Sequence, residues 1–399
     1  MPVIVERIVT RAADGCADAR ATIRTGFEDH EVWFRWPGVQ CAQAADAFLA
    51  IALLAAMRRG SALHVSGTVS ARLIQSLSTA QDILHAWDRG LQKVPVTAAS
   101  VHGSGCPPRL AQRVHAGSTF TGGVDSFYTV LKHHRELDAL IYVHGFDIAL
   151  ENEALRARVS TALRSAAERL DRPLIEVETN LRQFTDRYLD WNLAFGAALA
   201  AVGLLLAERV SLVYVPAGAS YLTLKPDGAH PLLNPLYGTE HTDFETDGCE
   251  ATRFEKVAAI ATSDIVQHTL RVCWENRGGA YNCGQCEKCL RTMAALEIVG
   301  ALDRCRTFDR RLDYGRLARA RPAHDDLDFF MRENLEAGER LGAAAGLLTA
   351  LRRNLRRQRA RALIKRLVSA AAASSRRVRR HLVPARLLST KAPHVKASD

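Results

Sequence analysis

Hydrophobic and polar residues follow two different patterns along the chain, and the pattern changes near residue 113. Before that point, short alternating stretches and helical periodicities together predict an α+β unit. Strands are predicted at 21–25, 32–36 and 62–66, and helices at 42–57 and 73–87. We interpret residues 1–112 as an accessory α+β domain with a linker-like segment, GSGCPP, at 103–108.

After residue 113, short apolar strands alternate with longer helical patterns. Strands are predicted at 139–143, 173–177 and 210–215, and helices at 152–170 and from about 191. This alternation predicts right-handed βαβ units and therefore a doubly wound parallel sheet of the α/β class. In such sheets ligands bind at the carboxyl ends of the strands. Phe146 and Asp147 follow the first of these strands, where adenine or a substrate can lie, although a plain turn explains them equally well.

The net charge of +10 is unevenly distributed over the 399 residues. Residues 351–399 contain 15 Lys and Arg against one acidic residue, which leaves 38 basic and 42 acidic residues before them. The body is therefore mildly acidic, so the whole-chain charge does not indicate a nucleic-acid binder. The length exceeds the roughly 250–300 residues at which one core usually stops growing, which favours more than one domain.

The basic residues belong to a predicted tail at 331–399, helical or partly disordered. Within it, apolar residues are expected near one side of a helix with Arg around the rest; they are Leu351, Leu355, Ile364, Leu367 and Val368. Such a helix can bind RNA, lie on an anionic membrane or dock on a protein partner. A solvated tail explains the composition equally well.

No targeting segment is recognised in the sequence. The first 16 residues lack the apolar core of a secretory signal, and the longest apolar run, 193–207, is shorter than the roughly 20 residues of a membrane span. We expect that run to form a buried helix and the protein to be cytoplasmic. Four of the nine cysteines fall within 17 residues, which in a reducing cytosol indicates a metal site rather than disulfides.

The first motif with chemical content lies between a predicted strand and a predicted helix, at 118–131. Its adjacent glycines, Gly122 and Gly123, allow a tight turn whose backbone N–H groups converge at the start of the helix, which favours a phosphate. The Gly-Lys-Ser/Thr ending of a Walker-type loop is absent. A strand-to-helix turn capped by Asp125 and Ser126 is the simpler alternative.

The second motif is a cysteine cluster. The ligands are predicted to be Cys273, Cys283, Cys286 and Cys289. Four thiolates suffice for a closed, tetrahedral and therefore structural Zn²⁺ site, and the C-x2-C-x2-C spacing presents three of them on one turn. An iron–sulfur cluster is the main alternative.

The glycine motif resembles the Ser-Gly-Gly-x-Asp-Ser loop of the ATP pyrophosphatase (PP-loop) superfamily, with Thr121 in place of the first serine. Both motifs, in this order and about 150 residues apart, resemble the 7-cyano-7-deazaguanine synthase family over about residues 115–300. The resemblance implies an adenine nucleotide alpha hydrolase-like catalytic domain at 113–330. It also implies an enzyme that uses ATP and Mg²⁺ to adenylate a carboxylate or carbonyl, releases pyrophosphate and then aminates the product.

The resemblance also implies roles for individual residues. The nucleotide phosphates are expected at Thr121, Gly122, Gly123, Val124, Asp125 and Ser126. Asp125 would act near the metal ion, and Arg291 matches an Arg that follows the last Cys in the family. Lys256, with Arg253, lies in a segment that resembles the one where the family places a Lys near the phosphates; surface charges on an amphipathic helix are the alternative.

The implied reactants are ATP, a small-molecule carboxylate such as a deazapurine, and ammonia. The sequence leaves the oligomeric state open, and a homodimer is one option. The chain departs from the family in its extra residues at both ends and in the segment 216–221, which replaces an acidic substrate segment. Two other functions therefore stay open. One is a tRNA-modifying, thiolation-type enzyme of the same superfamily, and the other is a non-catalytic nucleotide-binding subunit of a larger system.

Overall fold

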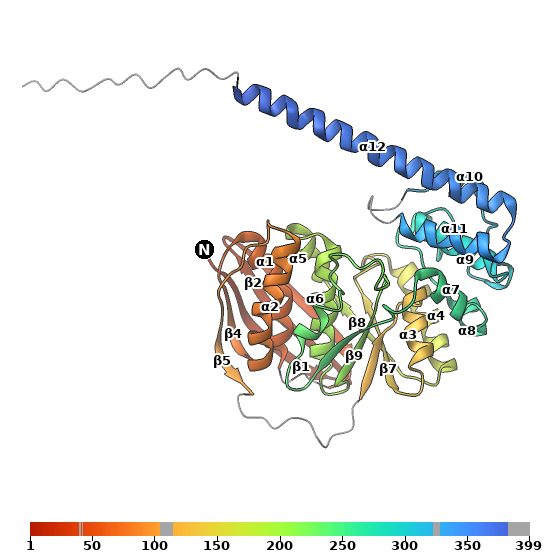
Figure 1. Cartoon of the computed structure of the whole chain (residues 1–399). Coiled ribbons are helices and arrows are strands. Elements are labelled where there is room, and N and C mark those ends of the chain that lie inside the picture. The colour runs from red at the N-terminus through yellow and green to blue at the C-terminus, as the bar shows by residue number, and fades with distance from the viewer. Residues whose placement is uncertain (40, 42, 104–114, 322–327, 382–399) are drawn as a thin grey trace, which may run out of the picture.

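The computed structural model describes residues 1–39, 41, 43–103, 115–321 and 328–381. Within these residues ten strands form one sheet, in the order β10-β9-β6-β7-β8-β3-β2-β1-β4-β5 (Figure 1). The strands are β1 (Val3–Ala13), β2 (Cys16–Thr25), β3 (Glu28–Pro37), β4 (Leu63–Ser70), β5 (Val96–His102), β6 (Ala116–Thr119), β7 (Leu137–His144), β8 (Leu174–Thr179), β9 (Leu212–Pro216) and β10 (Asp243–Asp247). Apart from Gly103, the predicted linker at 103–108 lies outside the described residues.

Helices cover the sheet and extend beyond one end of it. They are α1 (Ala44–Arg59), α2 (Ala71–Trp87), α3 (Val124–Lys132), α4 (Glu153–Arg169), α5 (Leu181–Tyr188), α6 (Trp191–Leu205), α7 (Arg253–Ile260), α8 (Asp264–Thr269), α9 (Glu287–Ile298), α10 (Tyr314–Leu317), α11 (Phe329–Leu341) and α12 (Ala345–His381). Short 3₁₀ turns lie at Asn234–Tyr237, Arg277–Gly279 and Leu302–Arg304. The predicted apolar run corresponds to α6, which is buried over most of its length. None of the helices in the described part of the chain combines the length and the apolar character that a membrane span requires.

Strands β10, β9, β6, β7 and β8 pair in parallel with one another in this order, whereas β8 pairs antiparallel with β3 on its other side. Their side chains alternate between two cores, because successive residues of a strand point to opposite faces. On β7, Leu140 and Tyr142 belong to the core that contains α3 and α4, whereas Ile141 and Val143 belong to the core that contains α6. The predicted α/β class is confirmed, with a mostly parallel sheet covered on both faces.

The N-terminal residues extend the same sheet. Strands β1, β2 and β3 are antiparallel, and β3 pairs with β8 through Phe34↔Thr179 and Arg35↔Glu178. Strands β4 and β5 continue parallel to β1. The predicted α+β elements at 1–112 therefore share one sheet and one core with the parallel strands, while the division into separate domains stays a prediction.

The last helices form a third packed cluster. Leu347, Leu351 and Leu355 of α12 are buried against residues of α9 and α11 such as Leu290 and Met331. Beyond this cluster α12 extends away from the rest of the protein (Figure 1).

The prediction that the apolar residues of α12 share one side is wrong. Leu351 and Leu355 are buried, whereas Ile364, Leu367 and Val368 are 59–64% exposed. Nine residues separate Leu355 from Ile364 and span two and a half turns at about 3.6 residues per turn, which puts the two on opposite sides.

A polar network joins α4 to the parallel strands. Glu176 of β8 accepts a hydrogen bond from Ser160 Oγ (2.6 Å), lies 2.8 Å from His144 Nε2 and pairs with Arg164. Burial alone would raise the pKa of Glu176, but its hydrogen bonds to these partners more than offset that effect. The pKa falls from 4.5 to about 2.

Glu176→Gln is expected to lower the free energy of unfolding at neutral pH, by at most about 3 kcal/mol. A carboxyl whose pKa is lower in the folded chain than in the unfolded chain stabilises the fold at any pH above the unfolded-state pKa. This contribution is lost as the pH falls toward the folded-state pKa. In denaturant unfolding, the difference in the free energy of unfolding between wild type and variant should become smaller as the pH falls below 4.5 toward 2. A difference in the free energy of unfolding that stays constant down to about pH 3.5 would contradict this account.

Candidate functional site

The glycine motif lies where the strand order reverses. Strand β6 is flanked by β7 on one side and by β9, which comes later in the chain, on the other. At such a point the segments that follow two neighbouring strands leave toward opposite faces of the sheet, and room for a ligand remains between them. The segment that follows β6 leads directly into α3, so the motif occupies the position at which α/β proteins bind ligands.

The turn itself depends on glycine. Gly122 has φ +70°, and a Cβ there would lie 2.8 Å from Leu163 Cδ2. Gly123 is the N-cap of α3, with φ −84° and ψ 173°, and it has no side chain to satisfy the free N–H groups of the first turn. Ser126 Oγ donates to the Gly123 carbonyl (3.1 Å). The turn therefore presents backbone donors next to the positive end of the helix dipole.

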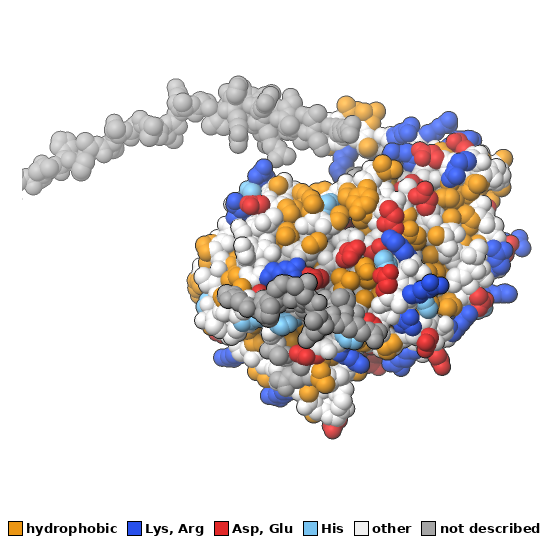
Figure 2. Space-filling view, turned by 60° about the horizontal axis from the view of Figure 1, so that its bottom comes forward, with side chains coloured by type: hydrophobic (Ala, Val, Ile, Leu, Met, Phe, Trp, Pro, Cys, Tyr) orange, Lys and Arg blue, Asp and Glu red, His pale blue; other side chains and the backbone are white. Residues whose placement is uncertain are grey.

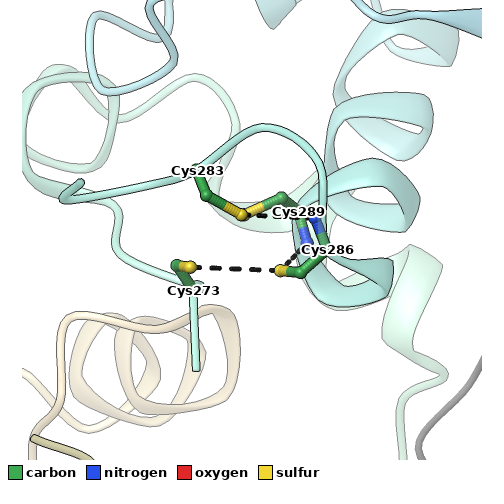
Figure 3. A group of neighbouring side chains, drawn as sticks. All are labelled: Cys273, Cys283, Cys286 and Cys289. Atoms are coloured by element: carbon green, nitrogen blue, oxygen red, sulfur yellow. Dashed lines mark hydrogen bonds between the residues drawn. The ribbon is translucent and has the colours of Figure 1, made fainter. Parts of the chain in front are cut away.

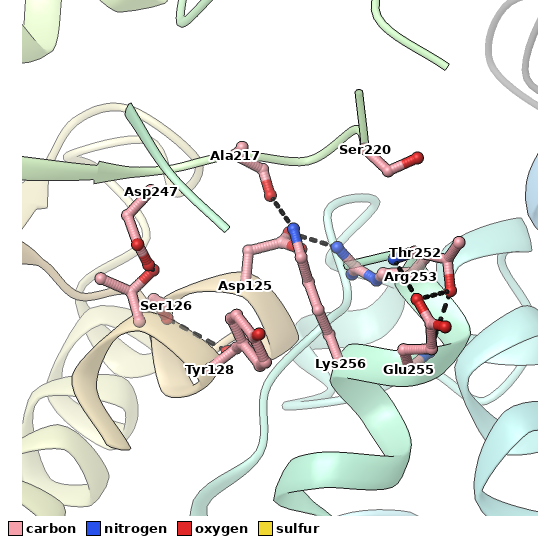
Figure 4. A network of polar contacts seen from close by, with 12 residues as sticks. Asp125, Ser126, Tyr128, Ala217, Ser220, Asp247, Thr252, Arg253, Glu255 and Lys256 are labelled. Carbon is pink, nitrogen blue, oxygen red and sulfur yellow. Dashed lines mark hydrogen bonds and ion pairs between the residues drawn. The ribbon is translucent and has the colours of Figure 1, made fainter. Parts of the chain in front are cut away.

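Asp125, on the first turn of α3, meets two cations from α7 (Figure 4). Arg253 pairs with Asp125 Oδ2, and Lys256 Nζ lies 3.6 Å from Asp125 Oδ1. Lys256 is 1% exposed and donates to the Ala217 carbonyl (2.7 Å), directly after β9. The cluster thus joins the segments that follow β6 and β9.

The electrostatics of Asp125 keep it ionised. Burial would raise the pKa of this carboxyl, but the charges of Arg253 and Lys256 outweigh burial and the pKa is lowered. Asp125 Oδ1 is buried and has no hydrogen-bond donor among the described residues. Its carboxylate therefore has acceptor capacity that a metal ion or a metal-bound water can use.

Two further cations lie within electrostatic reach of this cluster, both from α9. Desolvation lowers the pKa of Lys288, an effect that Arg291 and Arg253 reinforce and that Asp147 and Asp125 oppose. Burial likewise lowers the pKa of Arg291, and the charges of Arg253 and Asp125 also act on it. Four cations therefore lie around Asp125, and one of them, Arg291, also pairs with Glu287 (3.3 Å).

Two of these guanidinium groups have unused donors. The buried Nε atoms of Arg253 and Arg291 have no hydrogen-bond partner in the part of the chain that the structure describes. Arg291 also lies 3.8 Å from the centre of the Phe330 ring, which fixes the plane of its guanidinium group. Buried donors without acceptors are costly, and an anionic ligand with several oxygens would satisfy them.

The four predicted ligand cysteines are brought together in a buried cluster (Figure 3). Their Sγ atoms lie within 4.8 Å of one another, and the pairs Cys283–Cys289 and Cys273–Cys286 are 4.0 Å apart. Tetrahedral Zn²⁺ with Zn–S bonds of about 2.3 Å places its sulfurs about 3.8 Å apart. The cluster can therefore hold a metal ion such as zinc.

Local backbone geometry produces this arrangement. Gly284 adopts φ +63°, which lets the chain turn so that Cys283 Sγ accepts from the backbone N of Cys286 (3.2 Å). Cys286 then caps α9 and its Sγ accepts from the backbone N of Cys289 (3.4 Å). Such N–H donors stabilise thiolates.

One connecting segment links the cysteine cluster to the glycine turn. The Gly122 carbonyl accepts from the backbone N of Arg271 (2.8 Å), two residues before Cys273. Asn282 Oδ1 accepts from the backbone N of Cys273 (3.2 Å), and Asn282 Nδ2 donates to the Leu270 carbonyl (2.8 Å). The segment that carries Cys273 is therefore hydrogen-bonded both to the glycine turn and to the residue before Cys283.

Two other predicted residues have contacts of their own. Val124 is buried in the core, so only its backbone can face a ligand. Phe146 packs on Trp191, and its predicted place beside adenine or a substrate stays a prediction. Sequence analysis missed Lys288, although it stands inside the C-x2-C-x2-C motif, where its position beside ligand cysteines could have drawn attention to it.

A cavity of about 690 Å³ lies elsewhere, between α4 and the ends of β2 and β3. The ionic groups at its centre pair with one another: Glu176 with Arg164, and Glu178 with Arg156. These pairs leave little charge for a ligand. The glycine turn, with its unused donors, is the better candidate site.

Comparison of the chain with family models, with curated proteins and with solved structures returned no match.

Proposed function

We propose that the chain is an ATP-dependent enzyme of the PP-loop class, similar to 7-cyano-7-deazaguanine synthases. It adenylates a carboxylate and releases pyrophosphate, and ammonia then displaces AMP to give an amide. Where a nitrile is formed, a second ATP adenylates the oxygen of the amide carbonyl, and loss of AMP and a proton leaves the nitrile. In this proposal the parallel half of the sheet is an adenine nucleotide alpha hydrolase-like domain. The acceptor is a small-molecule carboxylate, with a deazapurine as the first candidate.

The observation that carries the proposal is the meeting of Asp125 with Arg253 and Lys256 beside the Gly122–Gly123 turn. These residues come from segments more than 120 positions apart, yet they surround one helix N-terminus. Cleavage between the α- and β-phosphates develops negative charge on the leaving pyrophosphate. Fixed backbone donors and buried cations stabilise such charge without reorganisation.

Each group has a role in this chemistry. The N–H groups of the turn and the unused Nε donors of Arg253 and Arg291 would bind phosphate oxygens. Lys256 is held in place by the Ala217 carbonyl and would neutralise the developing charge. Asp125 fits Mg²⁺ or its water ligands, because one carboxylate oxygen has no hydrogen-bond donor among the described residues. Mg²⁺ would supply charge neutralisation at the phosphates.

Zinc is proposed for the cysteine cluster in a structural role. All four thiols are buried, and a site with four protein ligands has no open position for a substrate. Its contribution would be to fix the segment that hydrogen-bonds to Gly122.

Three of the five cysteines outside the cluster give the thiolation alternative little support. Such chemistry needs a nucleophilic thiol that is not a metal ligand. Burial raises the pKa of the thiols of Cys41, Cys249 and Cys305, to about 11 for Cys41. A thiol with a raised pKa is a weaker nucleophile at neutral pH because little of it is thiolate.

ATP–pyrophosphate exchange tests the proposal directly. Purified protein, Mg²⁺ and labelled pyrophosphate are incubated with a panel of carboxylates, with 7-carboxy-7-deazaguanine first. We expect label to enter ATP only when an accepted carboxylate is present. Nucleotide binding without exchange for any carboxylate, together with stable protein partners, would instead support the non-catalytic subunit.

A further inference from the structure

Helix α12 carries an apolar stripe that faces away from the body of the protein. The stripe consists of Leu363, Ile364, Leu367 and Val368, whose side chains are 59–64% exposed. Two residues of the same helix, Leu351 and Leu355, pack against the body. They lie on roughly the opposite side of the helix from the stripe. The stripe therefore cannot continue the packing seam of α12.

The surroundings of the stripe are strongly cationic. Arg356 and Arg357 precede Leu363 and Ile364 by seven residues, a spacing that puts them on the same side of the helix. Both are exposed. The sequence of α12 from Leu351 to its end at His381 contains no acidic residue. The face of the body in Figure 2, by contrast, carries acidic and basic side chains side by side.

We propose that this face of α12 binds an anionic lipid surface, with the apolar stripe at the level of the upper acyl chains and the arginines at the phosphates. Helices that lie in a membrane interface combine aliphatic residues on one side with arginine or lysine beside them. Each Lys or Arg near an anionic bilayer strengthens membrane binding by electrostatic attraction. Each aliphatic side chain that enters the acyl region strengthens it by the hydrophobic effect.

Other occupants fit the stripe less well. RNA would pair with the arginines, but it offers no apolar surface for four aliphatic side chains, and recognition of bases relies on aromatic and polar groups. A second copy of α12 would bring cations against cations. An anionic bilayer matches both the charge and the apolar character of the face.

Vesicle flotation of the purified full-length protein tests the proposal. We expect binding to phosphatidylcholine vesicles with about 30% phosphatidylglycerol and little binding to pure phosphatidylcholine. The double substitution Leu363→Gln, Leu367→Gln should weaken binding by about tenfold or more, because it removes two aliphatic side chains from the stripe. Arg356→Gln, Arg357→Gln should weaken it by about tenfold.

A matched control is available on the neighbouring helix. Leu341, at the end of α11, is 52% exposed but lies outside α12, so Leu341→Gln should leave vesicle binding unchanged. All of these positions are exposed, so the variants should fold, and circular dichroism checks this. Binding that is absent, equal on both vesicle types, or unaffected by the leucine substitutions would overturn the proposal. Tighter binding to a short RNA, insensitive to the leucine substitutions, would assign the face to RNA instead.

Discussion

Gly123→Asp is expected to stop ATP turnover while leaving the fold intact. Gly123 occupies the N-cap of α3 with extended backbone angles, a position and a conformation that Asp favours, so helix stability should be unchanged or slightly higher. The new carboxylate would satisfy the N–H groups of the first turn and repel phosphate from them. We expect kcat/KM for ATP to fall by at least about a hundredfold, by analogy with the loss of one oxyanion donor.

Gly123→Asn is the matched control for this variant. Asn has nearly the same shape as Asp and caps a helix equally well, but it carries no charge. A Cβ at this position would lie 3.2 Å from Thr121 Oγ1 and 3.5 Å from the Arg271 carbonyl, so both variants meet the same modest crowding. Activity should be clearly higher in the Asn variant than in the Asp variant. Equal activity of the two, or wild-type activity in both, would show that the turn binds no phosphate.

Cys283→Ala is expected to have the largest effect on stability. It removes one of four buried ligands and the acceptor for the backbone N of Cys286. Bound zinc should fall from about one per chain toward zero. Loss of a structural metal should cost about 3 kcal/mol or more, which corresponds to a fall in Tm of about 4 °C or more for a chain of this size.

Cys305→Ala separates the loss of metal from the loss of a buried thiol. Cys305 is also buried, at 4% exposure, but it stands outside the cluster. Its substitution should leave the zinc content unchanged and lower Tm much less. Visible absorbance and iron in the wild-type protein would instead identify the cluster as an iron–sulfur centre. If the two variants had the same Tm and the same metal content, the cysteine cluster would not be a metal site.

Strands β7, β8 and β9 of the parallel half could be predicted from the sequence because they are short segments rich in apolar residues between helical patterns. The run from Ala139 to Val143, for example, lies within β7, as expected for a strand buried on both faces. Strands β5 and β10 were missed because neither is a continuous apolar run: β5, VTAASVH, mixes valine and alanine with polar residues, and β10, DFETD, has one apolar residue. Both strands lie at the edges of the sheet. The pairing of β3 with β8 could not be predicted, because it joins segments about 145 residues apart.

The candidate site was predictable only where its residues are adjacent in sequence. The turn and the C-x2-C-x2-C motif have local spacing that shows their chemistry. Lys256 and Arg253 were singled out through a resemblance, and their contact with Asp125 depends on how α7 packs against α3. The unused donor of Arg291 follows from burial, a property of the folded chain that no sequence motif encodes.

The most direct test of the central claim is the identity of the products when the protein consumes ATP. ATP labelled in the α- and γ-phosphates is incubated with Mg²⁺, ammonia and the carboxylate that supports exchange, and the labelled products are separated by chromatography. The account predicts AMP and pyrophosphate in equal amounts, both lost in Gly123→Asp. Release of ADP and inorganic phosphate, at a rate that this substitution does not change, would contradict it.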